Sequence, residues 1–277
     1  MDIRDILLAL RADAPCANIL AWAAVLAARH DARIEGVCLY SEPVFALAGD
    51  FAVRQRAVAG VLDNRALAET GLIAPMKAAF VEVMGAHGVT AHWTSPPPDE
   101  PPATTAARAR TADLAMVRSP DLHRPAQRAL AWTLALLSGA PTLLVPDSAR
   151  PAADFKRVVV AWNGSANAKR VLDASLSLLK RAAMVEIATV DDGPVGSPRA
   201  APDALLSHLD RHGVRATFHH GGRDHNAGRA ILARCAAVRA DLLVMGAYGH
   251  WRIAEAAFGG VTETILTAAE IPVLMAH

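Results

Sequence analysis

Glycines that follow a short apolar run are the clearest chemical signal in this chain. The run Leu242–Met245 is long enough for a buried strand and too short for a helix. Gly246 and Gly249 come directly after it, and nine residues separate Gly249 from the Gly259–Gly260 pair. A helix is expected to begin at Val261–Thr262. Glycines let backbone N–H groups approach an anion and a helix N-terminus adds partial positive charge, so the spacing predicts a phosphate-binding loop.

This spacing resembles the nucleotide loop of the universal stress protein family, in which a strand ending in Met-Gly precedes G-x-x-G, a nine-residue spacer and G-[S/T]-V-T. The chain matches that pattern at Gly246, Gly249, Gly259, Val261 and Thr262. It departs at Gly260, where ATP-binding members carry Ser or Thr. The glycine keeps its N–H but loses a hydroxyl bond worth roughly 1.5–3 kcal/mol.

The resemblance implies ATP or a related adenine nucleotide as the ligand, and it adds residues from other strands to the site. The family places the loop after the first strand, here Ala161, Trp162 and Asn163, against ribose and adenine. It places the end of the second strand, near Val190, against the base, and Met245 against the base edge. Asn163 stands where the family usually has Asp, so the negative charge that would attract Mg²⁺ is missing.

The elements that must position this loop occur twice along the chain. Each half alternates strand and helix candidates, beginning and ending with a strand. The matching segments are Asp5–Leu10 with Arg157–Trp162, Ala86–Trp93 with Arg211–Phe218, and Ala140–Leu143 with Ile271–Leu274. The first half carries extra length at residues 42–74. Two diverged copies of one unit explain the pattern.

The alternation predicts an α/β fold with two tandem domains, each a mainly parallel five-stranded sheet with helices on both faces. We expect domains at residues 1–146 and 155–277, joined by a linker at 147–154. The resemblance adds that the last strands, Thr142–Val145 and Val273–Ala276, pair edge to edge as an intramolecular pseudo-dimer. Such pairing hides two exposed edges. Further homo-oligomer formation stays open.

The first copy lacks the glycine loop. Its fourth strand, Leu114–Val117, runs into Arg118–Pro125, which contains no glycine and has two prolines without an N–H. Arg11 stands where the second copy has Asn163. Arginines of this loop could attract an anion, but poor affinity is expected without a shaped backbone pocket. We therefore expect nucleotide in the second copy alone.

Composition argues against several other classes of protein. The formal net charge is +1 and Lys and Arg form no long run, so no nucleic-acid surface is expected. Cys16, Cys38 and Cys235 lie far apart and outside any C-x-x-C, as is typical of reduced cytosolic thiols. The uncharged run Ala129–Pro146 is broken at Ser138–Pro141, which argues against a membrane span. The N-terminus does not match a signal peptide, and we expect a cytoplasmic protein.

Histidines are the remaining candidates for metal chemistry. His208 and His212 have a metal-compatible i, i+4 spacing, and His219–His220 are expected to end a strand. Adjacent residues on a strand point to opposite faces, and no Cys or paired carboxylate joins these histidines at a zinc spacing. We expect solvated or capping histidines and no metal site.

Motifs for catalysis do not accompany the loop. The chain has no G-x-S-x-G, H-E-x-x-H, P-loop or Rossmann motif, and no carboxylate pair or Cys–His pair near the glycines. We predict a stress-response binding or regulatory protein that is not an enzyme. Two alternatives stay open: a ligand-free interaction scaffold of the same fold, and a slow ATPase or phosphotransferase.

Overall fold

The computed structural model describes residues 2–12, 14–39, 71–97, 100, 102–121, 125–191, 202–224, 226–247 and 260–277. The strands within these ranges are β1 Asp5–Arg11, β2 Arg33–Leu39, β3 Ala91–Thr94, β4 Leu114–Arg118, β5 Thr142–Val145, β6 Arg157–Ala161, β7 Met184–Asp191, β8 Ala216–Arg223, β9 Leu242–Gly246 and β10 Val273–Ala276. The helices are α1 Ala17–His30, α3 Ile73–Ala86, α4 Pro102–Arg108, α5 Pro125–Leu137, α6 Ala166–Leu179, α7 Pro202–Arg211, α8 Ala227–Val238 and α9 Gly260–Ala268, with a 3₁₀ turn, η1, at Ala109–Thr111.

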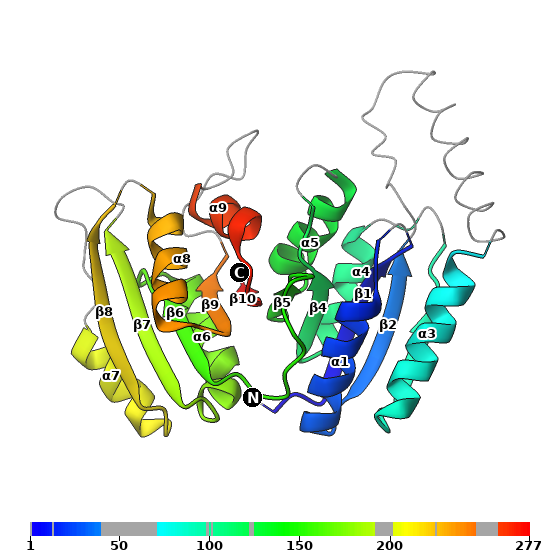
Figure 1. The fold of residues 1–277 in the computed structure, drawn as a ribbon, viewed down its shortest axis with the longest axis horizontal. Helices are drawn as coiled ribbons and strands as arrows, with labels where there is room; N and C mark the ends of the chain where they lie inside the picture. The colour runs from blue at the N-terminus through cyan, green and yellow to red at the C-terminus, as the bar shows by residue number, and fades with distance from the viewer. Residues whose placement is uncertain are drawn as a thin grey trace, which may run out of the picture.

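The described strands form one ten-stranded sheet in the order β3-β2-β1-β4-β5-β10-β9-β6-β7-β8. Each half of that order repeats one topology: β1 pairs in parallel with β2 and β4, and β6 pairs in parallel with β7 and β9. Figure 1 shows β1–β5 on one side of the molecule and β6–β10 on the other. The expected α/β fold with two tandem, mainly parallel units is confirmed.

Alternation along the strands supplies two apolar cores, one on each face of the sheet. In β1, Ile6 and Leu8 pack into one core while Leu7 and Ala9 pack into the other, because successive strand residues point to opposite faces. Helices α1, α3, α6 and α7 contribute to the first core. Helices α4, α5, α8 and α9 contribute to the second, so both faces are covered as predicted.

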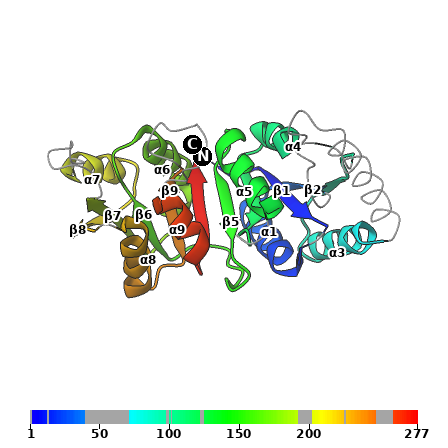
Figure 2. The same cartoon turned by 90° about the horizontal axis from the view of Figure 1, so that it is seen from above.

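The two halves meet at an antiparallel pair of strands, β5 and β10. The register sets Val273 opposite Leu144 and Met275 opposite Thr142. Figure 2 shows these strands side by side at the centre of the molecule. The predicted edge-to-edge pairing within one chain is therefore confirmed, and each strand hides the other's backbone groups from water.

Residues 146–155, which connect the halves, are fixed to helix α1. The side-chain amide of Asn18 donates to the carbonyls of Pro146, Asp147 and Ala149 at 3.0–3.2 Å. Trp22 Nε1 donates to the Ala149 carbonyl at 3.1 Å. The Trp22 ring also stacks on Phe155, with 5.8 Å between ring centroids. The connection is thus held against α1, with Phe155 buried at its end, and is not a loose tether.

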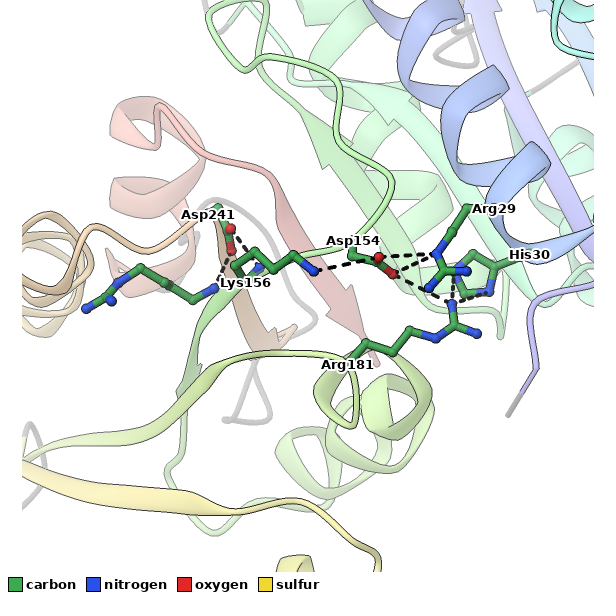
Figure 3. Close-up of polar contacts among 7 residues, drawn as sticks. Arg29, His30, Asp154, Lys156, Arg181 and Asp241 are labelled. Carbon is green, nitrogen blue, oxygen red and sulfur yellow. Dashed lines mark hydrogen bonds and ion pairs between the residues drawn. The ribbon is translucent and has the colours of Figure 1, made fainter.

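Charged side chains gather beside this connection, as Figure 3 shows. Asp154 accepts from Arg29 Nε at 3.1 and 3.2 Å, with Lys156 Nζ at 3.8 Å and Arg181 Nη1 at 3.9 Å. Burial would raise the pKa of Asp154, but Arg29, Lys156 and Arg181 together lower it. His30, 8% exposed, lies 3.4–3.5 Å from Arg181 Nη1. Burial, then Arg181 and Arg29, lower the His30 pKa.

Strand β8 continues to Arg223, so the prediction that His219–His220 end this strand was wrong. The strand is longer because β7 pairs with it through an irregularity between Thr189 and Asp191. Most of the Ala-rich stretch at 42–74 lies outside the described residues. Among the helices that are described, none is both long and apolar enough to span a membrane.

Candidate functional site

The carboxyl ends of β6, β7 and β9 bring most of the predicted site residues to one edge of the sheet. The strand register places Ala161 between Met245 of β9 and Ala188 of β7. Val190 lies farther along β7, and helix α9 begins at Gly260. Ligands of parallel α/β sheets bind at this edge. Of the predicted residues, Gly249 and Gly259 lie outside the part of the chain that is described.

The turn after β6 is organised to start helix α6. Asn163 Oδ1 accepts from Ser165 N at 3.1 Å, and Gly164 between them has a φ of 75°, which favours glycine. Ser165 is the N-cap of α6, and its Oγ accepts from Ala168 N at 3.2 Å. The Asn-Gly-Ser segment is therefore a capping turn, and one Asn163 lone pair is already used.

Gly246 allows helix α6 to pack closely against the end of β9. A Cβ at this position would lie 2.6 Å from Ala168 N and 2.8 Å from the Asn167 carbonyl carbon. Asn167 Nδ2 also donates to the Ala247 carbonyl at 2.7 Å, which fixes the chain where it leaves β9. The glycine thus has a packing role that its place in the loop pattern did not reveal.

Exposure divides the predicted residues into three groups. Met245 and Thr262 are buried in or beside the core. Asn163 and Gly260 are exposed, and a Cβ built on Gly260 meets no atom within 4 Å. The remaining described residues of the predicted site are partly exposed: Ala161, Trp162, Val190, Gly246 and Val261. A ligand at this edge would meet the exposed group first, and the Thr262 hydroxyl is not presented to solvent.

Histidine and cysteine side chains do not form a second site within the described ranges. The His208 and His212 rings contact each other with centroids 4.6 Å apart, and His208 Nε2 is 3.9 Å from Asp173. The described residues contain no group of three or more His, Cys, Asp or Glu that could hold a metal ion. All three cysteines are free thiols. Burial raises the pKa of Cys235 to about 12, which keeps this thiol protonated and unreactive.

An ion pair between a buried glutamate and a partly exposed arginine was missed from the sequence. Glu186 in β7 receives Arg234 Nε and Nη2 of α8 at 2.6 Å each. The hydrogen bond from Arg234 outweighs burial and lowers the Glu186 pKa. The pair ties α8 to the sheet. The one available signal was a glutamate inside the apolar run Met184–Val190.

The equivalent edge of the N-terminal half carries arginine. Ala9 pairs with Val117 as Ala161 pairs with Met245, so Arg11 and Arg118 stand where the other half has Asn163 and Gly246. Arg118 donates to both carboxylate oxygens of Asp147, and its Nη1 donates to Gln127 Oε1 at 3.2 Å. Arg11, Arg118 and Gln127 border a cavity that the sequence did not predict.

A protein-family comparison adds to this geometry. The model described as the universal stress protein family matches residues 154–277. Residues 154–277 form a universal stress protein domain. The matched segment contains β6–β10 and every residue of the predicted nucleotide site. A search of curated proteins finds no match.

Solved structures resemble the whole chain and not the universal stress protein domain alone. A universal stress protein from Archaeoglobus fulgidus is 16% identical with a TM-score of 0.69, and the match covers 98% of this chain and 97% of that one. A Pseudomonas aeruginosa protein described as a universal stress protein is 14% identical with a TM-score of 0.58, covering 99% and 93%. The cytoplasmic domain of a prokaryotic cation chloride cotransporter is 11% identical with a TM-score of 0.52, covering 99% and 95%. At these identities the likeness concerns the fold alone.

Proposed function

We propose that the C-terminal domain binds ATP or a related adenine nucleotide at the carboxyl ends of β6, β7 and β9. One observation carries the proposal: Gly260 is the first residue of helix α9, it is exposed, and the position of a Cβ on it is open. Backbone N–H groups at a helix N-terminus bind phosphate without a charged side chain. The glycine spacing of the sequence supports the same ligand.

The protein then acts as a regulatory module and not as a catalyst. Nucleotide shifts the chain between two states that present different surfaces to a partner, which requires different affinities for the two states. In this proposal the N-terminal domain covers residues 1–146, the linker 147–154 and the nucleotide-binding domain 155–277, acting in the cytoplasm. A slow ATPase would instead release phosphate in a manner that depends on the loop glycines.

A ligand-free scaffold of the same fold is the second candidate, and two observations favour it. Asn163 Oδ1 is engaged by Ser165 N at 3.1 Å, and Met245 and Thr262 are buried. A scaffold would use the edge to hold α6 and α9 in place and would bind no nucleotide. A direct measurement of ATP binding distinguishes the nucleotide-binding module from the ligand-free scaffold.

Calorimetric titration of the full chain with ATP, with and without Mg²⁺, tests the proposal. Gly260→Ser adds the hydroxyl in open space, so we expect affinity to rise about tenfold, the lower end of a charge-assisted hydrogen bond. Gly85→Ser is the matched control, because Gly85 in α3 also has no neighbour within 4 Å of a Cβ. Asn163→Asp should make binding more dependent on Mg²⁺.

Absence of ATP binding to folded wild-type protein and to Gly260→Ser would overturn the nucleotide proposal and leave the scaffold. Equal gains from Gly260→Ser and Gly85→Ser would show that the effect is not local to α9. Phosphate release that disappears in loop-glycine variants would favour the slow ATPase.

A further inference from the structure

The side chain of Asn167 connects helix α6 to the point where the chain leaves β9. Asn167 is the second residue of α6, and its Nδ2 donates to the Ala247 carbonyl at 2.7 Å in a partly buried bond. The other end of the amide is held as well, because Oδ1 accepts from Arg170 Nη1 at 2.7 Å. A guanidinium only donates hydrogen bonds, so this contact orients the amide with its NH₂ group toward Ala247.

The backbone groups of Ala247 are fixed from two sides. Its N–H donates to the Ala276 carbonyl of β10 at 2.8 Å, and its carbonyl accepts from Asn167. Ala247 is fully buried, and Gly246 before it lets α6 lie against the end of the strand. The direction in which the chain leaves β9 is therefore set by a side chain of α6 as well as by the sheet.

The N-terminal half uses the equivalent asparagine differently. Asn18 is the second residue of α1, as Asn167 is of α6. Ser119, which follows β4 as Ala247 follows β9, likewise donates its N–H to the last residue of the neighbouring strand, at 2.8 Å. Asn18 instead donates to three carbonyls of the connection at 146–149. The two asparagines therefore stand at equivalent positions but hold different segments: the exit of β9 in one half and the connection between the halves in the other.

We propose that Asn167 is a positioning residue for the phosphates of the nucleotide. It fixes the exit of β9, after which the sequence continues through Gly249 to Gly260. This inference rests on the proposed function, in which the helix N-terminus at Gly260 binds phosphate.

The turn after β6 does not depend on the Asn167 side chain. Asn163 Oδ1 accepts from Ser165 N, and Ser165 Oγ accepts from Ala168 N, so this turn is held by hydrogen bonds of its own. Loss of the Asn167 amide should therefore loosen the phosphate side of the site and leave the nucleoside side, on β6 and β7, in place. That difference separates a positioning role from a general loss of structure.

Calorimetric titration of the full chain with ATP and with adenosine tests the proposal. Asn167→Ala should weaken ATP binding about three- to tenfold, as expected for loss of one neutral hydrogen bond, and should change adenosine affinity less than about twofold. Asn18→Ala is the matched control, because it removes the equivalent asparagine from the other half and should leave both affinities unchanged. The positioning role is overturned by unchanged ATP affinity, by equal losses for ATP and adenosine, or by the same loss from Asn18→Ala.

Amide hydrogen exchange of the ligand-free protein gives a second measurement. The Ala247 N–H is protected by its bond to Ala276, and Asn167→Ala should raise its exchange rate about three- to tenfold because local opening becomes easier. The Ser119 N–H makes the equivalent bond in the other half and should exchange at an unchanged rate. Faster exchange at Ala247 in a chain whose wild type binds no ATP would overturn the proposed function, and Asn167 would then fix the exit of β9 for packing alone. Unchanged exchange at Ala247 would overturn the positioning role whether or not ATP binds.

Discussion

The two halves of the sheet share strand order and register but differ in the side chains at the carboxyl ends of their strands. The N-terminal half ends β1 and β4 with Arg11 and Arg118, which border a small cavity. The C-terminal half has Asn163 and Gly246 at these positions, and α6 packs directly on the glycine. The shared topology therefore gives both halves the same edge, while the residues at two equivalent positions give the two edges different shape and charge.

The two halves share one apolar core, and Phe155→Ala gives the largest effect that can test whether they unfold as one unit. Phe155 is buried against Trp22 of the other half. Its loss should lower the free energy of unfolding by about 3–5 kcal/mol, measured by urea denaturation, with one transition retained. Leu72→Ala, at an exposed residue, should cost little by comparison. Two separate transitions in the wild-type protein would show that the halves fold independently.

Gly246→Ala tests the close approach of α6 to β9, which the N-terminal half does not need. The new Cβ would lie 2.6 Å from Ala168 N, so the helix must shift. We expect a loss of about 1–3 kcal/mol in the free energy of unfolding. Gly260→Ala, in open space, should stay within about 0.5 kcal/mol of wild type. Equal effects of the two changes would contradict the packing role.

Glu186 and Glu35 occupy the same place in the two halves, opposite Val159 and Leu7. Glu186 has a two-point bond from Arg234, whereas Glu35 accepts from Thr94 Oγ1 at 2.9 Å. Glu186→Gln should therefore cost about 1.5–3 kcal/mol and Glu35→Gln about 1 kcal/mol or less. Urea unfolding of both variants at neutral pH measures the two losses in the free energy of unfolding. A larger loss from Glu35→Gln than from Glu186→Gln would contradict the conclusion that the Glu186–Arg234 pair is the stronger interaction.

The smallest expected effect is a pH dependence at the junction of the halves. His30 faces Arg181 and Arg29, with Asp154 and Asp2 as the nearby acids, and its pKa is lowered. The unfolded chain therefore binds the proton more readily, with a pKa near 6.5. Neutral His30 therefore makes its full contribution to the free energy of unfolding above about pH 6.5, and this contribution is lost as the pH falls below that value. His30→Gln should flatten the profile of stability against pH between about pH 7 and pH 5. A variant profile identical to that of the wild-type protein would refute the role of His30.

Much of the fold follows from the sequence because its signals are local. Apolar runs such as Leu242–Met245 mark buried strands, and the repetition of Asp5–Leu10 in Arg157–Trp162 identifies two units. The pairing of β5 with β10 was predicted from the family resemblance and not from the residues alone. Helix α9 begins at Gly260, one residue before the expected Val261, because capping and packing set the ends of a helix.

Contacts between residues far apart in the sequence could not be predicted in the same way. Gly246 matched a loop pattern, but its contact with Ala168 depends on how α6 crosses the strand. Arg11 and Arg118 were noticed separately, and Gln127 completes their cavity from a helix that no local pattern connects to them. The pairing of Glu186 with Arg234 is likewise a product of packing, since charge alone does not select one partner.

Because β5 pairs with β10 inside one chain, the pairing affects how the protein responds to dilution and how the sequences of its two halves can diverge. Subunits joined only by noncovalent contacts separate when their concentration falls. Here the two edges face each other at a local concentration set by the anchored segment 146–155, however little protein is present. The halves are also always made in a one-to-one ratio. The side chains of one half can therefore change while the other half keeps its own, because neither half has to find its partner again.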